Sequence, residues 1–366
     1  MRMKLLITGA KGFMGRHVAI HAQRHGHDVF GFDIDSSDDD LKSYVQQADA
    51  IIHLAGVNRP SETREFYVSN VLLTQHLIEL VQTCHPTIPV IFASSIQADL
   101  DNDYGKSKKQ AEALLRTRLG NAYIYRLTNT FGKWCRPNYN SVCATFCHNI
   151  AKGLPISIRD ENYVVHFNYV EDIAEDFLRV LEGGAPQIGE DGFFHVDPIY
   201  GCSLGHLAEL LSYFKGEVES PRHLPLLHDE FELKLFKTFC DYLSEPGYSY
   251  NYAADGRGSF EEFYKSNKWG QISENIAFPG ITKGGHYHSY KKEIFYTVLG
   301  ECLITQRNPK TGELIKNHVC GRKPELIDIR VGFTHEITNV GQSDSHTVMW
   351  ISEPYNPDSP DTYKDD

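Results

Sequence analysis

The sequence predicts two domains: a doubly wound, parallel-sheet α/β domain over residues 1–244 and an all-β jelly-roll barrel over residues 245–366. Strands alternate with helical stretches through the first part, which is the pattern of βαβ units. Short strands separated by glycine-containing turns follow after the segment SEPG (Ser244–Gly247). The length of 366 residues also exceeds what one hydrophobic core ordinarily supports.

The elements of the first domain follow in order from local patterns. A β-rich run at 4–8 precedes a helix at 12–25, which Gly26 would end as a C-cap. Further strands are expected at 29–33, 50–54, 90–93 and 122–126. Further helices are expected at 70–82, 104–118, 142–151, 170–182, 204–214 and 231–243.

The second domain is predicted from a series of β-rich runs: GRGSF, QISENIAF, EIFYTVLGECLITQR, ELIDIRVG and HTVMWISEP. Their regular spacing, with glycine at the turns, indicates a β-barrel or jelly roll. The polar ending NPDSPDTYKDD is expected to fray, as terminal segments without anchoring contacts do.

Composition excludes several classes of protein. The formal net charge of −12 opposes non-specific binding to nucleic acid or anionic lipid. No apolar run reaches membrane-spanning length, and the start MRMKLLITGAKGFMG lacks a signal-peptide cleavage site, so membrane insertion is not expected. The eight cysteines are scattered without a CxxC pair, which indicates reduced thiols and a cytoplasmic enzyme. A homodimer is the expected assembly, because two-fold pairs are the commonest oligomers.

A glycine-rich turn joins the first strand to the first helix. Gly9, Gly12 and Gly15 form G-x-x-G-x-x-G, with Phe13 and Met14 between the last two. Glycines allow the backbone to approach a pyrophosphate, and the helix N-terminus offers free N–H groups. The turn therefore predicts a dinucleotide site.

The second predicted strand ends at Asp33. An acid at this position accepts hydrogen bonds from an adenine-ribose hydroxyl and repels a 2′-phosphate. Asp33 alone therefore favours NADH over NADPH.

Three polar side chains suggest hydride-transfer chemistry. Tyr104 and Lys108 are four residues apart at a helix start, which puts both on one face of the helix. A lysine ammonium is expected to lower the pKa of a nearby phenol, so that Tyr104 exchanges a proton with a sugar carbonyl. Ser95, after the fourth strand, can hydrogen-bond the same carbonyl oxygen.

This part of the chain resembles the extended short-chain dehydrogenase/reductase family, a group with a Rossmann domain. The matching motifs are TGAKGFMG, HLAG, SS…YGKSK, RLTNTFG and YVEDIA, together with Asn70. The resemblance implies that Ser95, Tyr104 and Lys108 are catalytic. It also implies that the stretch Leu54, Ala55 and Gly56 lies along a nicotinamide cofactor.

The second domain carries a candidate metal site. His286, His288 and Glu293 form G-x-H-x-H-x-x-x-x-E, and two histidines two apart on a strand face the same way. His335, in GFTHEITN, can join them from a facing strand. Three imidazoles and a carboxylate suit zinc or another divalent transition metal.

This segment resembles the cupin superfamily, although Arg330 stands where cupins usually carry a proline before their second histidine. The run DGRGSF (Asp255–Phe260) is similar to one in the nucleotide-sugar 3,5-epimerases, a metal-free cupin branch. That resemblance implies that His286 is either a metal ligand or a base. Lys283, three residues before it, is a second candidate base.

The combination resembles the CapF-type family of capsular polysaccharide enzymes in the UDP-N-acetyl-L-fucosamine pathway, on HLAGVNRP, FGKWCRPNYNSVCATFCHNIAKG and FPGITKGGHYH. The resemblance implies C3 epimerisation in the cupin and C4 reduction in the Rossmann domain. The implied substrate is UDP-2-acetamido-2,6-dideoxy-4-hexulose, and the implied product is UDP-N-acetyl-6-deoxy-L-talosamine. It also implies NADPH, against the tendency of Asp33 toward NADH.

Substrate contacts are predicted in and before the segment KWCRPNYN. Arg136 can meet a diphosphate, and Asn138 or Asn140 the sugar. Asn129, in RLTNTFG, is a further candidate. The alternative is a sugar-nucleotide 4-epimerase or dehydratase with a structural, dimerising cupin. Asp99 and Asp101, in the loop before Tyr104, are the acids that a dehydratase would use.

Overall fold

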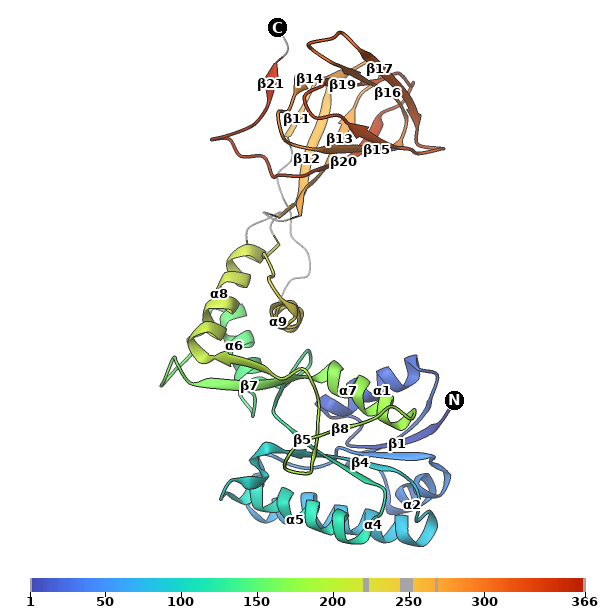
Figure 1. Ribbon diagram of the computed structural model, residues 1–366, viewed down its shortest axis with the longest axis vertical. Coiled ribbons are helices and arrows are strands. Elements are labelled where there is room, and N and C mark those ends of the chain that lie inside the picture. Colours follow the sequence, from blue (N-terminus) through green and yellow to red (C-terminus); the bar gives the residue numbers. More distant parts are fainter. Residues whose placement is uncertain (1, 220–223, 244–252, 267–268, 365–366) are drawn as a thin grey trace. The chain divides into compact units, whose positions relative to one another are not determined.

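The computed structural model describes residues 2–219, 224–243, 253–266 and 269–364. The chain divides into two compact units, Met1–Leu211 with Asp229–Ser244, and Ser212–His228 with Glu245–Asp366. The boundary predicted after residue 244 falls within 244–252, outside the described residues. The predicted architecture, a parallel α/β domain followed by an all-β domain, is confirmed (Figure 1).

The first unit is built on a seven-stranded sheet with the order β2-β1-β3-β4-β5-β9-β8. Its pairs are parallel except for β8 against β9. The strands are β1 (Lys4–Thr8), β2 (Asp28–Phe32), β3 (Ala50–His53), β4 (Val90–Ser95), β5 (Ala122–Leu127), β8 (Gln187–Ile188) and β9 (Phe194–His195). The strand order reverses between β1 and β3, and the carboxyl edge at such a reversal is where doubly wound folds bind ligands.

Helices cover both faces of this sheet (Figure 1). One face packs against α2 (Asp38–Gln47), α4 (Leu73–Cys84) and α5 (Asp103–Arg118), and the other against α1 (Phe13–Arg24) and α7 (Val170–Leu181). Alternate strand residues supply the two cores. On β3, Ile51 packs on the first face and Ile52 on the second. This alternation explains why the apolar runs at 50–54 and 90–93 are buried on both sides.

The remaining elements of the first unit are a second, smaller sheet and several shorter helices. A small sheet has the order β10-β7-β6. Its strands are β6 (Asn129–Phe131), β7 (Val164–Tyr169) and β10 (Tyr200–Ser203). The further helices are α3 (Arg64–Phe66), α6 (Val142–Ala151) and α9 (Glu230–Cys240), together with α8 (Leu204–Glu219), whose residues from Ser212 onward belong to the second unit. A π-helix, η1 (Tyr67–Leu72), precedes α4, and a short 3₁₀ helix, η2 (Ile96–Asp99), follows β4.

The second unit contains two sheets whose strand pairs are antiparallel. The first has the order β11-β12-β13-β20-β15-β18, and the second β17-β16-β19-β14-β21. The strands of the first are β11 (Ala253–Asp255), β12 (Gly258–Ser266), β13 (Gly270–Ala277), β15 (Glu293–Leu299), β18 (Leu326–Ile329) and β20 (Ser345–Ile351). Those of the second are β14 (Thr282–Tyr287), β16 (Glu301–Arg307), β17 (Leu314–Cys320), β19 (Thr334–Asn339) and β21 (Tyr363–Lys364).

The end of the described chain corrects one prediction. The polar ending was expected to fray, but Tyr363 and Lys364 form β21 and pair with β14. Asp361 just before them is only 3% exposed. The physical reason is twofold: carboxylate and carbonyl hydrogen bonds anchor the segment, and the Tyr363 ring stacks on that of Tyr287.

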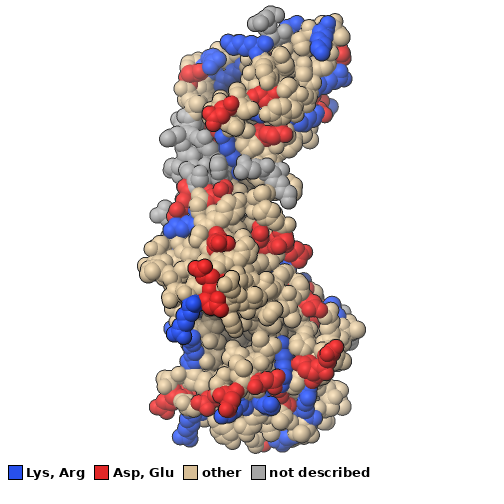
Figure 2. All heavy atoms as spheres, turned by 60° about the vertical axis from the view of Figure 1, so that its left-hand side comes forward, with Lys and Arg blue, Asp and Glu red and all other residues tan. Residues whose placement is uncertain are grey.

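The surface carries charged side chains of both signs. On the face shown in Figure 2, acidic and basic side chains are interspersed over both units. Within the described ranges, no helix is both long and apolar enough to cross a bilayer.

Candidate active sites

A cavity of about 410 Å³ lies at the carboxyl edge of the parallel sheet. The turn after β1 contributes Gly12, Phe13 and Met14, and the loop after β3 contributes Leu54 and Gly56. The cavity therefore sits at the strand-order reversal, where the glycine-rich turn was predicted to hold a dinucleotide. Ala55 and Asp33 are outside the set of lining residues.

Two glycines of the turn are required by its geometry. Gly9 adopts φ +69°, a region that side-chain-bearing residues rarely occupy. A Cβ on Gly15 would lie 2.0 Å from the carbonyl oxygen of Gly9, so only glycine lets α1 pack this closely. Gly12 is the N-cap residue of α1, whose first N–H groups therefore face the cavity side of the turn.

Asp33 is tied to this turn. Its carboxylate accepts from the backbone N–H of Lys11 at 2.7 Å and from that of Ile34 at 2.9 Å. The Lys11 ammonium pairs with Asp35 next to it. Asp33 thus fixes the glycine-rich turn in addition to any contact with a cofactor ribose.

Ser95, Tyr104 and Lys108 all line this cavity. Ser95 ends β4, and Tyr104 and Lys108 lie on the first turns of α5, which Asn102 caps by accepting from the N–H of Gly105. Ser95 and Tyr104 are hydrogen-bonded to each other. The Lys108 ammonium donates to the carbonyl oxygen of Ala93 at 2.9 Å.

The pKa values of this set differ from the expectation in one respect. We expected Lys108 to lower the pKa of Tyr104, but burial raises the pKa of that phenol, and the hydrogen bond with Ser95 offsets the rise only in part. Burial lowers the pKa of Lys108 to about 8, against the opposing charge of Glu112. Tyr104 is therefore held in its protonated form, which suits a proton donor.

A buried ion pair lies next to Ser95 and Lys108. Arg126 on β5 donates two hydrogen bonds to Glu112, which is one helical turn after Lys108. Ser94, the neighbour of Ser95, donates to the same carboxylate at 2.5 Å. The pair therefore joins the ends of β4 and β5 to α5.

The two acids considered for a dehydratase are engaged elsewhere. Asp99 accepts from Arg126 at 2.5 Å, and Asp101 pairs with Lys106 at 2.7 Å. Neither carboxylate lines the cavity. The geometry therefore gives no support to the acid–base pair that a dehydratase needs.

The predicted substrate segment reaches the same cavity. Asn129, Arg136 and Asn140 are among its lining residues. Asn138 is not: it adopts φ +55° and donates its backbone N–H to Thr145. Sequence reasoning missed Tyr139, whose ring lies 4.9 Å from the Arg136 guanidinium. An aromatic residue three positions after the arginine was the available signal.

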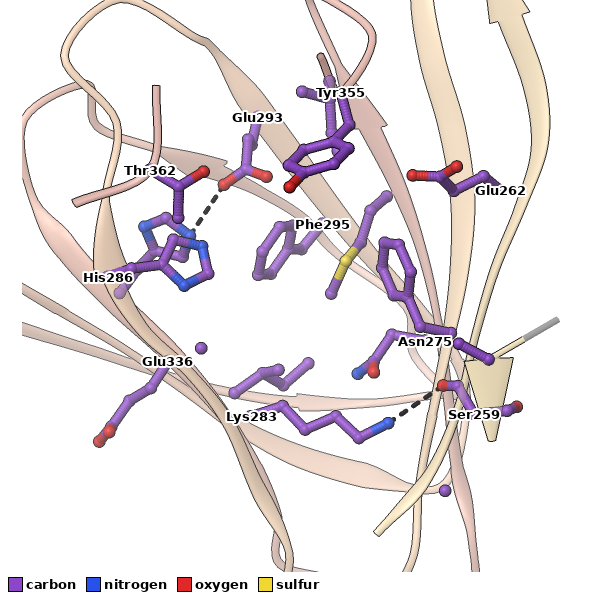
Figure 3. Close-up of a pocket in the computed structure, with 18 of the residues that line it drawn as sticks. Ser259, Glu262, Asn275, Lys283, His286, Glu293, Phe295, Glu336, Tyr355 and Thr362 are labelled. Carbon is purple, nitrogen blue, oxygen red and sulfur yellow. Dashed lines mark hydrogen bonds and ion pairs between the residues drawn. The ribbon is translucent and has the colours of Figure 1, made fainter. Parts of the chain in front are cut away.

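A second cavity, of about 470 Å³, opens between the two sheets of the C-terminal domain (Figure 3). His286 on β14 and His335 on β19 are direct partners in the antiparallel register. A bulge between Gly284 and His286 sets that register. Gly284 has φ +103°, and a Cβ at this position would clash with the His335 carbonyl oxygen. Glu293 reaches the cavity from β15, on the other sheet.

The three histidines and Glu293 lie together in this cavity. One ring nitrogen from each of His286, His288 and His335 lies within 4.8 Å of the others. Glu293 Oε2 lies 2.8 Å from Nε2 of His335 and 3.4 Å from Nε2 of His288. This carboxylate oxygen is buried without a hydrogen-bond donor among the described residues.

Tautomers explain why that oxygen lacks a donor. Nδ1 of His288 faces the carbonyl oxygen of Asp361 at 2.5 Å, and Nδ1 of His335 faces that of Phe333 at 3.2 Å. A carbonyl only accepts, so each Nδ1 carries hydrogen and each neutral ring turns a lone pair toward Glu293. A divalent cation satisfies all of these groups at once, and a metal-bound histidine commonly donates its other N–H to a carbonyl. The residues therefore fit a metal.

The pKa values reflect the same crowding. Burial lowers the pKa of His286 to about 4, so its ring is neutral. Burial alone would raise the pKa of Glu293, but the neighbouring His288 and His335 rings hold it at about 2. Burial acts to lower the pKa of His288, but the charge of Glu293 beside it raises that pKa overall. A transition metal binds a charged carboxylate and neutral imidazoles, so it would displace the proton from His288.

Lys283 lines the opposite part of this cavity, where its ammonium group donates to the carbonyl oxygens of Ser259 at 3.0 Å and Ile276 at 2.8 Å (Figure 3). Burial lowers the pKa of Lys283. The two contacts use two N–H groups, so a neutral amine keeps its lone pair for a proton.

Sequence reasoning missed the polar lining of β13. Gln271, Ser273 and Asn275 alternate along the strand and are buried, and Gln271 and Asn275 line the cavity. Asn275 Nδ2 has no hydrogen-bond partner in the described part of the chain. The signal was present in QISENIAF, because inward positions of an ordinary barrel strand are apolar.

Two family models match the chain. Residues 5–190 match the NAD dependent epimerase/dehydratase family, and residues 253–363 match the polysaccharide biosynthesis C-terminal domain. A crystal structure of a UDP-glucuronic acid 4-epimerase from Bacillus cereus in complex with NAD is 18% identical with a TM-score of 0.55, covering 66% of this chain and 98% of that one. At that identity it supports the fold of the first domain alone.

Two relatives span nearly the whole chain. UDP-2-acetamido-2,6-beta-L-arabino-hexul-4-ose reductase from Pseudomonas aeruginosa is 40% identical, over 99% of this chain and 98% of the relative. The crystal structure of the capsular polysaccharide assembling protein CapF from Staphylococcus aureus is 42% identical with a TM-score of 0.87, covering 98% of this chain and 99% of that chain. The chain therefore belongs to the NAD-dependent epimerase/dehydratase family and, within it, to the CapF type, which joins such a domain to a polysaccharide biosynthesis C-terminal domain.

Proposed function

We propose that the chain is a bifunctional enzyme acting on a UDP-linked 4-keto-6-deoxy amino sugar, UDP-2-acetamido-2,6-dideoxy-4-hexulose. Its cupin-type domain inverts C3, and its Rossmann domain then reduces C4 to give UDP-N-acetyl-6-deoxy-L-talosamine for surface polysaccharide synthesis. The observation that carries this proposal is the pairing of a Ser95–Tyr104–Lys108 cavity with a second cavity that holds Lys283 and four converging metal-ligand side chains. The Pseudomonas relative, named as a reductase of a 4-keto sugar nucleotide, supports the substrate class.

Epimerisation uses the ketone to acidify its neighbour. The C4 carbonyl makes the C3 hydrogen removable, and Lys283 is the candidate base because burial lowers its pKa and its two hydrogen bonds leave a lone pair available in the neutral form of the amine. Tyr355, whose hydroxyl points into the cavity on the side away from Lys283 (Figure 3), is positioned to return a proton to the other face of C3. His286, His288, His335 and Glu293 would hold zinc, which offsets negative charge on an enolate oxygen when bound.

Reduction then removes the acidifying ketone. Tyr104 donates its proton to the C4 oxygen, Ser95 hydrogen-bonds that oxygen, and Lys108 offsets the charge that remains on the phenolate. The glycine-rich turn and Leu54 would hold the nicotinamide cofactor, which supplies the hydride to C4 when bound. Arg136 is placed to meet the diphosphate. The proposed cofactor is NADPH or NADH. The Asp33 carboxylate already accepts a hydrogen bond from the turn, so its presence does not by itself indicate a ribose contact.

Two assays on the full-length protein test the proposal. Incubation with the 4-keto sugar nucleotide in deuterated water, without nicotinamide, should place deuterium at C3, and a strong chelator should suppress that exchange. Addition of NADPH or NADH should then give substrate-dependent loss of nicotinamide absorbance. Absence of any such loss with either cofactor would refute the reductase, and absence of exchange would refute the epimerase.

The pH profile of the reduction follows from Lys108. Its pKa of about 8 means that the ammonium is charged below that pH and neutral above it. Tyr104 has a raised pKa, so the proton donor stays protonated through the same range. We expect kcat/KM for reduction to be level below pH 8 and to fall above it by about tenfold per pH unit. Lys108→Met should be slow at every pH and lack this limb, and a wild-type profile that stays level well above pH 8 would contradict the assignment.

A further inference from the structure

Asp361 makes several hydrogen bonds with the turn between β14 and β15 of the cupin-type domain. Its carboxylate accepts from the backbone N–H groups of Ser289 at 3.0 Å, Tyr290 at 3.1 Å and Lys291 at 3.0 Å. It also accepts from the Ser289 hydroxyl. Its backbone carbonyl, in turn, accepts from Nδ1 of His288.

These contacts fall on the segment that joins two of the proposed metal ligands, His288 and Glu293. The turn runs from His288 to Glu293, and it connects the sheet that carries the histidines to the sheet that carries the carboxylate. Three successive backbone N–H groups converge on one carboxylate, which is how a concave turn binds an anion. The Asp361 carboxylate therefore occupies the anion-binding position that these three N–H groups form.

The segment around Asp361 is itself held in place. Asp361 adopts φ +44°, which is uncommon for a residue other than glycine and persists only where surrounding contacts impose it. Lys291 donates to the carbonyl oxygen of Pro360 at 2.7 Å, and β21 follows at Tyr363. The four donors keep the pKa of Asp361 at about 2 although burial acts to raise it, so the carboxylate remains charged.

We propose that Asp361 is a positioning residue of the metal site, fixing both the His288–Glu293 turn and the ring orientation of His288. The proposal rests on the metal site of the proposed function. The carboxylate holds the backbone of the turn, so the separation of His288 from Glu293 is set. The carbonyl keeps hydrogen on Nδ1 of His288, so Nε2 keeps a lone pair for a cation.

The test compares two variants of the full chain that lose the same charge. Asp361→Asn replaces one acceptor oxygen with an NH₂ group that faces backbone donors. Asp358→Asn, three residues earlier and exposed, is the matched control. Ser289→Ala removes only the hydroxyl contact and is a milder variant, should Asp361→Asn fail to fold. Zinc affinity is measured by competition with a chromogenic chelator. Amide exchange at 289–291 and histidine-ring nitrogen NMR are measured on metal-free protein.

We expect Asp361→Asn to weaken zinc binding by about 10–100-fold, the range found when outer-shell partners of metal ligands are removed. Amides 289–291 should exchange faster, and His288 should lose its fixed tautomer, while Asp358→Asn matches the wild type. Unchanged exchange and an unchanged tautomer would overturn the proposal. Faster exchange with unchanged zinc affinity would also overturn it. If the wild type bound no zinc, the proposed metal would fail, and the tautomer and exchange data alone would decide on Asp361.

Discussion

Tyr104→Phe should reduce the rate of substrate reduction by roughly 10²–10⁴-fold, the contribution expected of a positioned proton donor. The phenol is buried in the first cavity, bonded to Ser95, and its raised pKa keeps the proton available. Loss of the hydroxyl removes that proton but leaves the ring volume. The measurement is substrate-dependent oxidation of reduced nicotinamide under single-turnover conditions.

Cofactor binding and epimerisation serve as internal controls for Tyr104→Phe. Fluorescence titration with the reduced nicotinamide should give near wild-type affinity, and deuterium should still enter C3, because that step belongs to the second cavity. Tyr163→Phe changes an exposed tyrosine in the same domain and should leave all three readouts unchanged. A Tyr104→Phe protein that reduces substrate at the wild-type rate would remove Tyr104 from the mechanism.

Lys283→Met should slow the rate of deuterium incorporation at C3 by a factor of about 10²–10⁴. The substitution removes the candidate base and keeps a long side chain. Within the described residues, the Lys283 side chain donates hydrogen bonds to the carbonyl oxygens of Ser259 and Ile276, and neither residue is a proposed metal ligand. Zinc content should therefore persist. The measurement is mass spectrometry of the sugar nucleotide after incubation in deuterated water.

The comparison of three variants separates base from metal ligand. His288→Ala should lose both zinc and exchange, Lys283→Met should lose exchange alone, and Lys310→Met, at an exposed turn, should lose neither. If Lys283→Met retained exchange while His288→Ala did not, His286 would become the remaining candidate base.

Local spacing explains what the sequence could predict of the sites. Tyr104 and Lys108 share one helix face, and His286 and His288 share one strand, so their mutual positions follow from helix and strand geometry alone. The placement of His335 depended on the prediction that its strand faces the strand of His286. The antiparallel register of β14 with β19 agrees with that prediction. The glycine-rich turn carries its own geometric reason, because Gly15 must pass close to Gly9.

Long-range polar contacts explain what could not be predicted. The hydrogen bond between His288 and Asp361 joins residues 73 apart, and no periodic pattern links them. Asp361 looked like one acid in a polar ending, and Asn275 like one polar residue in a strand. The raised pKa of Tyr104 was also out of reach, because the burial of a side chain depends on tertiary packing that the YxxxK spacing does not describe.

The position of Asp361 in the chain has a consequence for biogenesis. Of the described residues around the second cavity, Asp361 and Thr362 come last in the sequence, whereas the described lining of the first cavity ends at Ser141 and its loop is held by Asp241 and Tyr242. Domains generally fold in order as a polypeptide emerges from the ribosome. The nascent protein should therefore complete its first cavity once residue 242 has emerged, and acquire a fully shaped second cavity, the proposed zinc site, only after residue 361 has been released from the exit tunnel.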